Sequence, residues 1–353
     1  MGIFRTVHSL KRRAGLLLLG AMLPLGMLGA ASPVSAASAY GTCTDVPLPV
    51  ALATGQSANQ TISGELCTPN TWAAGAHQVD VATSGATYNK SYFDWQNPST
   101  YSYADKTLQA HRAIFVYDRI GTGASSHPPS ASISIQSDAY VLHQIIQWLR
   151  MSQGYTQVNA IGHSYGSVIT VDEAGTYKDE NRVVLTGLLH APDPGLAALA
   201  DFLFPALLDP RTGVALDPGY LTTIPHSRSV FYSPATTDPT VMAYDNAHPD
   251  TVSATSLSTS ALVNYGVPGV NNPADHIMAP VLLVNGEDDN FFCGSLEILN
   301  CADGSAVEAY EAPYFTSAAS LTAKSVPHTG HDLALSTSAD QSFAMINDWI
   351  VQQ

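Results

Sequence analysis

A serine between two glycines stands where a strand-like run gives way to a helical pattern. The apolar run 157–161 leads into Gly162-His163-Ser164-Tyr165-Gly166, and a helical pattern follows over 167–177. This G-x-S-x-G pattern, placed between a strand and a helix, is typical of a nucleophilic serine presented above a sheet. The turn is so sharp that side chains beside the serine would collide, which glycine avoids. We predict that Ser164 is a nucleophile.

A serine hydroxyl is a weak nucleophile until a base takes its proton, so a histidine and an orienting carboxylate must follow. The strand-like run 281–284 ends in a group of acids, and the run 321–326 leads to two histidines. Because the carboxyl ends of parallel strands meet at one edge of a sheet, these groups are expected to converge on Ser164. The candidates are the acids Glu287, Asp288 and Asp289 and the histidines His328 and His331.

Apolar runs alternate with helical patterns along the chain, which is typical of a parallel sheet with crossover helices. Leu142, Ile145, Ile146 and Leu149 recur at helical spacing and predict a helix over 136–151. A last helix is expected over 338–351. The strand candidates are 78–83, 113–117, 157–161, 183–189, 281–284 and 321–326. We predict an α/β fold with a mostly parallel sheet flanked by helices.

Residues 192–278 break this alternation. They are rich in Pro, Thr, Asp and Ser, contain a short apolar helix candidate over 196–208, and show no clear strand. The segment is too long for an ordinary connection. We predict a mainly helical cap or lid inserted between two core segments, 40–191 and 279–353, with a surface loop as the alternative. Its apolar residues are candidates for lining an acyl pocket or for packing on the core, among them Phe202, Leu203, Phe204, Leu207 and Leu208.

The composition excludes several classes of protein. The 353 residues include 14 Lys+Arg against 29 Asp+Glu, a net charge of -15, with 45% hydrophobic and 12% charged residues. Disordered chains are more polar, and nucleic-acid binders need a basic surface. Basic residues up to Arg13 precede the apolar run 14–30, and small residues follow at Ala36 and Ala39. This order predicts a signal peptide over 1–39, with a membrane anchor as the alternative, and hence a secreted protein without a stable membrane anchor.

The four cysteines fall into two close pairs, which suits an oxidising exterior. Four cysteines allow three connectivities, and proximity favours Cys43–Cys67 and Cys293–Cys301. A metal site is the alternative, but no C-x-x-C or neighbouring histidine supports it. We predict two disulfides.

From Val79 to the C-terminus, the chain resembles the α/β-hydrolase superfamily. The resemblance is carried by Gly162-His163-Ser164-Tyr165-Gly166, Asp118-Arg119-Ile120-Gly121-Thr122-Gly123-Ala124-Ser125, Gly286-x-x-Asp289 and Gly330-His331-Asp332-Leu333. Within the superfamily, the chain is similar to secreted serine esterase-like proteins of bacteria and fungi. The resemblance implies that Asp289 is the acid and His331 the base.

The resemblance also implies an oxyanion hole made by the backbone N–H of Tyr165 and a second N–H from the loop after the first core strand. In the family this loop usually begins His-Gly, whereas here Ser84 precedes Gly85. The second donor remains a backbone amide, so the departure is tolerable. By position we expect Ala86 to be that donor, with Gly85 and Thr87 as alternatives.

These expectations combine into a serine hydrolase that cleaves small-molecule esters or lactones through an acyl-enzyme, with no cofactor, no metal and no nucleic-acid partner. The same three groups also serve peptidases, amidases and acyltransferases. A catalytically silent binding protein on the same fold is a further alternative.

Overall fold

The computed structural model describes residues 35–37, 39–73, 77–191, 194–213, 217–264, 268–270, 272–293 and 299–353. The predicted signal peptide over 1–39 lies almost entirely outside these residues. Among the described residues, no helix is both long enough and apolar enough to cross a membrane.

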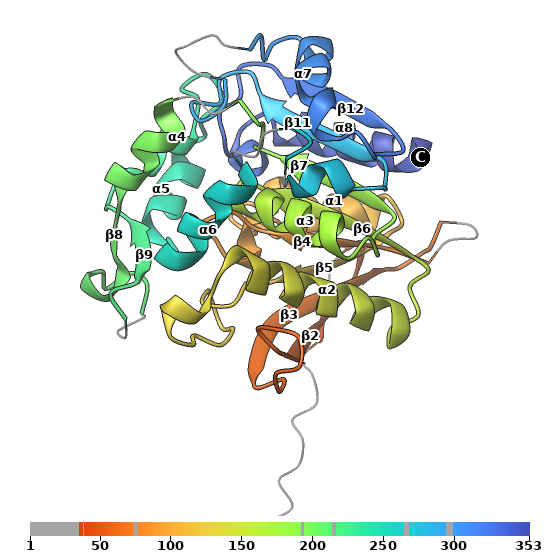
Figure 1. Ribbon diagram of the computed structural model, residues 1–353, viewed down its shortest axis with the longest axis horizontal. Helices are drawn as coiled ribbons and strands as arrows, with labels where there is room; N and C mark the ends of the chain where they lie inside the picture. Colours follow the sequence, from red (N-terminus) through yellow and green to blue (C-terminus); the bar gives the residue numbers. More distant parts are fainter. Residues whose placement is uncertain are drawn as a thin grey trace, which may run out of the picture. The chain divides into compact units, whose positions relative to one another are not determined.

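A nine-stranded sheet forms the centre of the fold, in the order β1-β2-β3-β5-β4-β6-β7-β11-β12 (Figure 1). All neighbours from β5 to β12 run parallel, and the pairs β1–β2, β2–β3 and β3–β5 are antiparallel. The strands of the parallel part are β4 (Gln78–Thr83), β5 (Ala113–Tyr117), β6 (Gln157–His163), β7 (Arg182–Thr186), β11 (Val281–Gly286) and β12 (Leu321–Val326). The fold is therefore α/β with a mostly parallel sheet, as predicted.

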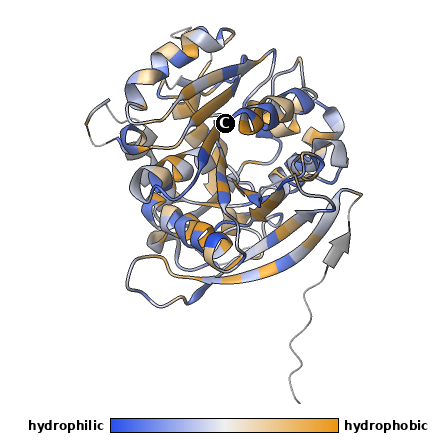
Figure 2. Cartoon of the chain, turned by 90° about the vertical axis from the view of Figure 1, so that its right-hand side faces the viewer, coloured by the Kyte–Doolittle hydropathy of each residue, from blue (hydrophilic) through white to orange (hydrophobic). Residues whose placement is uncertain are grey.

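The central strands are rich in β-branched, aliphatic and aromatic residues. Every residue of β5 and β11 is buried, as expected for parallel strands with helices on both faces. Figure 2 shows these central strands largely in the hydrophobic colour. The predicted strand 183–189 is too long by three residues, because the chain leaves the sheet after Thr186 and turns into the insertion.

Helices cover the sheet in two contacting groups. Helix α2 packs on α3 and α6, and α1 packs on α8. In α2 the predicted apolar face is buried, and Ser134 caps the first turn by accepting a hydrogen bond from the Ser137 N–H at 3.2 Å. The helices of the core are α1 (Tyr103–Gln109), α2 (Ile135–Met151), α3 (Tyr165–Thr176), α7 (Gly304–Glu311) and α8 (Ala339–Gln352).

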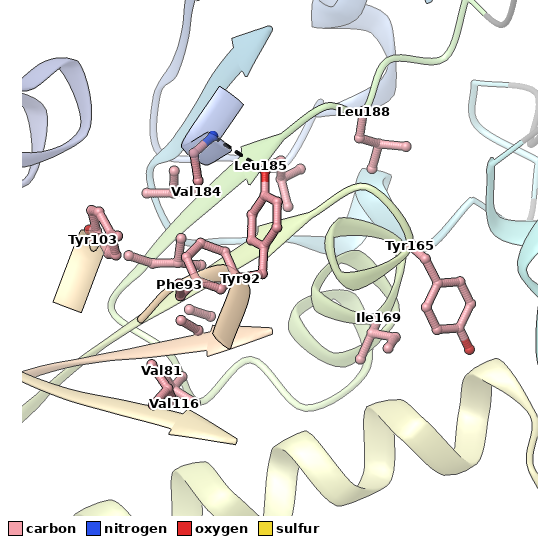
Figure 3. Packing of buried hydrophobic residues seen from close by; sticks show 14 of the residues in the cluster. Val81, Tyr92, Phe93, Tyr103, Val116, Tyr165, Ile169, Val184, Leu185 and Leu188 are labelled. Carbon is pink, nitrogen blue, oxygen red and sulfur yellow. Dashed lines mark hydrogen bonds between the residues drawn. The ribbon is translucent and has the colours of Figure 1, made fainter. Parts of the chain in front are cut away.

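Aromatic side chains fill the core beneath the edge that carries Ser164. Tyr92, Phe93 and Tyr103 pack among aliphatic residues of the central strands, whereas the Tyr165 side chain points away from them (Figure 3). The Tyr92 hydroxyl accepts a 3.4 Å hydrogen bond from the Ala334 N–H, so the core aromatics also hold the chain segment that follows β12.

The N-terminal extension adds antiparallel strands that the sequence did not reveal. Strands β2 (Gly41–Val50) and β3 (Gln60–Pro69) pair along their whole length, and the short β1 (Ser35–Ala37) pairs with β2. Cys43 lies opposite Cys67, and the two form a disulfide. The second disulfide joins Cys293 to Cys301. Both predicted disulfides are present.

The segment between β7 and β11 is mainly helical, as predicted, but it also contains short strands that were not predicted. It contains helices α4 (Pro194–Ala198), α5 (Pro239–Ala247) and α6 (Ala254–Asn264), but also a three-stranded antiparallel sheet of β8 (Leu203–Pro205), β9 (Tyr220–Thr223) and β10 (Val252–Ser253). The predicted helix over 196–208 is replaced by α4, a 3-10 turn over Leu199–Phe202 and β8. Proline at position 205 and the short apolar runs favour strand and turn over a continued helix. We call residues 192–278 the insertion.

Candidate functional site

Ser164 occupies the sharp turn between β6 and α3. Its backbone has φ 53° and ψ -121°, a strained conformation for a residue with a side chain. A Cβ on Gly166 would lie 2.0 Å from the Thr83 carbonyl oxygen, and one on Gly162 would lie 2.5 Å from the Ser167 Cα. Only glycine fits at these two positions, so the turn has the form that the sequence pattern predicts.

His331 and Asp289 complete a hydrogen-bonded relay with Ser164. His331 Nε2 lies 2.7 Å from Ser164 Oγ, and His331 Nδ1 lies 2.8 Å from Asp289 Oδ2. Asp289 is fully buried after β11, where its Oδ1 accepts a 2.9 Å hydrogen bond from the Phe291 N–H. Burial alone would lower the pKa of His331, but the charge and hydrogen bond of Asp289 outweigh it, so the pKa is raised.

The alternative acids and the alternative base lie in a separate cluster. Glu287 Oε2 accepts a 2.9 Å hydrogen bond from the His328 N–H, and Asp288 Oδ2 accepts one of 2.8 Å from the Ser233 hydroxyl. The His328 side chain is 71% exposed. The geometry therefore brings Asp289 and His331, rather than these residues, to Ser164.

The loop after β4 and the first residue of α3 lie beside Ser164. Within the described residues, neither the Ala86 nor the Tyr165 backbone N–H donates a hydrogen bond. Ala86, Gly85 and Thr87 line a pocket together with Ser164. Ala86 therefore belongs to the lining of the pocket, whereas Tyr165 directly follows Ser164 in the chain and does not line it.

Arg119 contacts both the loop after β4 and the first residue of α3. Its Nη2 donates a 2.9 Å hydrogen bond to the Gly85 carbonyl oxygen, and its guanidinium lies 5.0 Å from the centre of the Tyr165 ring. The Tyr165 hydroxyl in turn donates a 2.6 Å hydrogen bond to Asp138 Oδ2. Burial, followed by the charge of Asp138, raises the pKa of Tyr165, which keeps the hydroxyl protonated.

The pocket at Ser164 is also lined by His163 and His331. Three of its apolar lining residues come from the insertion, namely Leu199, Leu203 and Phe231. Of the apolar stretch singled out in the sequence, only Leu203 reaches the pocket. Leu207 and Leu208 are 40% and 65% exposed. The insertion thus supplies one wall of the site.

A buried ion pair of the insertion supports the loop after β4. Arg228 Nε lies 2.9 Å from Asp245 Oδ2, and both side chains are buried. Arg228 Nη1 donates a 3.0 Å hydrogen bond to Thr87 Oγ1, and its guanidinium lies 4.0 Å from the centre of the Tyr88 ring. The Tyr88 hydroxyl donates to Asp245 Oδ2 at 2.9 Å. Residues of the insertion therefore hold the loop that lines the pocket.

A second buried acid, Asp332, follows His331 in the chain. Asp332 Oδ2 also accepts a hydrogen bond from the Tyr88 hydroxyl, although Tyr88 has one proton to share between two carboxylates. Burial, together with the charge of Asp245, raises the pKa of Asp332 to about 7. Asp332 Oδ1 lies 3.4 Å from His163 Nε2. Burial lowers the pKa of His163, which is therefore neutral.

Sequence reasoning missed this network. Two of its residues stand next to predicted ones, since His163 precedes Ser164 and Asp332 follows His331. Their position next to predicted catalytic residues was the only feature of the sequence that could have pointed to them. Arg228 and Asp245 carried no motif, and only the folded chain brings them to Thr87 and Tyr88.

Comparisons with known proteins agree with this architecture. Residues 81–344 match the Alpha/beta hydrolase family. A search of curated proteins found no match. A thermophilic esterase from Thermogutta terrifontis has a similar structure, at 14% sequence identity, with 87% of this chain and 98% of that chain covered and a TM-score of 0.56.

Two further solved structures have the same fold. An esterase from Exiguobacterium antarcticum is 14% identical, with 82% of this chain and 96% of that chain covered and a TM-score of 0.55. A bromoperoxidase from Bacillus anthracis is 14% identical, with 83% and 96% covered and a TM-score of 0.52. The names of these proteins refer to different activities, two to esterases and one to a bromoperoxidase, so the fold alone does not identify a reaction.

Proposed function

Because the chain belongs to the Alpha/beta hydrolase family over residues 81–344, we propose that it is a serine hydrolase that cleaves neutral carboxylic esters or lactones. In this proposal Ser164, His331 and Asp289 are the catalytic residues. The observation that carries it is the relay in which His331 lies 2.7 Å from Ser164 Oγ and 2.8 Å from Asp289 Oδ2.

The proposed reaction begins when His331 Nε2 takes the proton of Ser164 as the oxygen attacks the ester carbonyl carbon. The negative charge that develops on the carbonyl oxygen is stabilised by the N–H groups of Tyr165 and Ala86. His331 then protonates the leaving alcohol, and an acyl-enzyme remains on Ser164. Water, deprotonated by His331, hydrolyses the acyl-enzyme, while Asp289 keeps the imidazole oriented throughout.

The lining of the pocket supports a neutral, partly apolar substrate. Leu199, Leu203 and Phe231 face the space above Ser164, and among the residues that the structure describes no Lys or Arg side chain lines it. An anionic substrate would have no counter-charge there. The predicted signal peptide and the disulfides Cys43–Cys67 and Cys293–Cys301 support an extracellular location for the reaction.

A fluorophosphonate probe tests the nucleophile directly. We expect one adduct per chain at Ser164, no adduct in Ser164→Ala, and strongly reduced labelling in His331→Ala. His328→Ala is the matched control and should label normally, because His328 lies outside the relay. Absence of labelling in the folded wild-type chain would contradict the proposal and would favour a silent binding protein.

A substrate panel separates the alternatives that share these residues. Acyl p-nitrophenyl esters, lactones and aminoacyl anilides should be compared by kcat/KM, with and without an acceptor alcohol. We expect hydrolysis of esters or lactones to exceed hydrolysis of anilides. A preference for anilides would identify an amidase, and product carrying the acceptor alcohol would identify an acyltransferase.

A further inference from the structure

The C-terminal end of α3, opposite the end that carries Ser164, contains a buried carboxylate without a donor. Glu173 lies in the last turn of α3 and is fully buried. Within the described residues, neither of its carboxylate oxygens accepts a hydrogen bond. Burial of an unpaired charge is costly, so this carboxylate must be neutralised by a proton or by a cation.

His143 of α2 and Asp179 of the loop before β7 face the same point. His143 Nδ1 lies 3.8 Å from Glu173 Oε1 and 2.7 Å from Asp179 Oδ2. One ligand atom from each of the three residues lies within 4.8 Å of the other two. The Tyr177 ring stacks on the His143 ring at a centroid distance of 4.0 Å and so fixes the orientation of the imidazole.

The surrounding charges favour a cation. Two further buried acids adjoin the ligands in the chain, since Asp172 precedes Glu173 and Glu180 follows Asp179. Arg150 donates to the Asp179 backbone oxygen and to the Asn181 side chain rather than to these carboxylates. The C-terminus of a helix adds partial negative charge. Of the three side chains in the cluster, His143 is therefore the only one that is not an acid.

We propose that His143 Nδ1, Glu173 and Asp179 bind a divalent metal ion of the Zn²⁺ type. One imidazole nitrogen and two carboxylates are a donor set for Zn²⁺, which binds nitrogen and oxygen at about 2.0–2.2 Å. Ca²⁺ needs about six to eight oxygen ligands and is disfavoured here. The three residues come from α2, α3 and the loop before β7, so the ion would join three elements of the core.

This site is structural and separate from the proposed chemistry. Helix α3 contains 12 residues, and at about 1.5 Å per residue its two ends lie roughly 18 Å apart. Metal binding at one end would stabilise the helix whose other end positions Ser164. Hydrolysis itself would remain independent of metal.

Zinc binding and thermal stability test the inference on the full chain after removal of metals with a chelator. We expect one Zn²⁺ per chain by isothermal titration calorimetry, with a Kd below about 10 µM, and a rise in thermal midpoint at saturating Zn²⁺, since a ligand that binds only the folded state stabilises it. Glu173→Gln should abolish both effects. Glu180→Gln removes an acid from the same region without removing a ligand and should retain both.

Two results would overturn the inference. One is the lack of saturable, stoichiometric Zn²⁺ binding in the wild-type chain. The other is an unchanged Zn²⁺ response in Glu173→Gln. If Glu173→Gln does not fold, His143→Ala provides the test, because its side chain is 23% exposed and tolerates truncation better. Fluorophosphonate labelling at 25 °C should be the same before and after chelation, which separates this test from that of the proposed hydrolase.

Discussion

Replacement of Asp332 by Asn should remove a large part of the pH dependence of stability. The pKa of this buried carboxyl rises from 3.8 to about 7, first through burial and then through the charge of Asp245. A carboxyl whose pKa is higher in the folded chain binds a proton on folding. Its contribution to stability is therefore fully present below about pH 4 and is lost as the pH rises through about 7.

The size of the effect follows from this shift. A change from 3.8 to about 7, at 1.36 kcal/mol per pH unit, corresponds to on the order of 4 kcal/mol. In Asp332→Asn the side chain is neutral at every pH and keeps nearly the same shape. The variant should therefore match the wild type near pH 4 and should lose less stability than the wild type above that pH. Between pH 5 and pH 8 the expected difference is about 3 kcal/mol, at 1.36 kcal/mol for each of the roughly two pH units from 5 to the pKa of about 7.

Urea denaturation at pH 5.0 and pH 8.0, followed by circular dichroism and fluorescence, measures the free energy of unfolding in each case. Other acids with raised pKa contribute to the wild-type value, so the relevant quantity is the difference between the pH dependence of the two chains. Asp340→Asn serves as the control, because the Asp340 side chain is 71% exposed. It should leave the pH dependence nearly unchanged.

Equal losses of free energy in wild type and Asp332→Asn between pH 5.0 and pH 8.0 would show that Asp332 does not bind a proton on folding. A variant much less stable than the wild type at pH 8.0 would show that the fold requires the ionised carboxylate. A second readout concerns activity. The charge of Asp332 adds to that of Asp289 in raising the pKa of His331, so the acid limb of the rate profile should move to lower pH in the variant.

Two further changes test how the site is positioned. In Arg228→Lys, the ammonium can still pair with Asp245 but loses the Nη1 hydrogen bond to Thr87 at 3.0 Å. We expect kcat for an ester to fall about tenfold with little change in KM, because the loop that carries Ala86 is held less firmly, whereas full loss of an oxyanion-hole donor costs roughly 10²–10³. Unchanged kcat in a folded variant would contradict this. The disulfide Cys293–Cys301 lies just after Asp289, and the Cys293 N–H donates a 2.6 Å hydrogen bond to the Asp289 carbonyl oxygen. Reduction of this disulfide should lower both the hydrolysis rate and the thermal midpoint. The role assigned to this disulfide would be lost if neither quantity changed.

Local sequence patterns were sufficient to predict several of the core strands and helix α2. Strands β4, β5 and β12 have the bounds that were predicted from the sequence. The helical spacing of Leu142, Ile145 and Leu149 predicted α2 to within one residue at its start. Glycine spacing around Ser164 predicted the sharp turn. In each case the information lies within a few neighbouring residues.

The remaining parts depend on contacts between distant residues. Strands β2 and β3 are rich in Thr, Pro and Gly, and only their pairing with each other and with β5 makes them strands. The short strands of the insertion likewise exist because they pair. Arg228 and Asp245 are widely separated from Thr87 in the sequence, so no spacing rule could connect them to the loop that lines the pocket.

The ion pair between Arg228 and Asp245 also bears on protein engineering. Insertions of this kind invite exchange between related enzymes as a means of changing specificity. Here Arg228 belongs to the insertion, whereas its partners Thr87 and Tyr88 belong to the core. A transplant of residues 192–278 alone would keep the ion pair but would lose the hydrogen bond of Arg228 to Thr87 and that of the Tyr88 hydroxyl to Asp245. The smallest exchangeable unit is therefore the insertion together with the loop after β4.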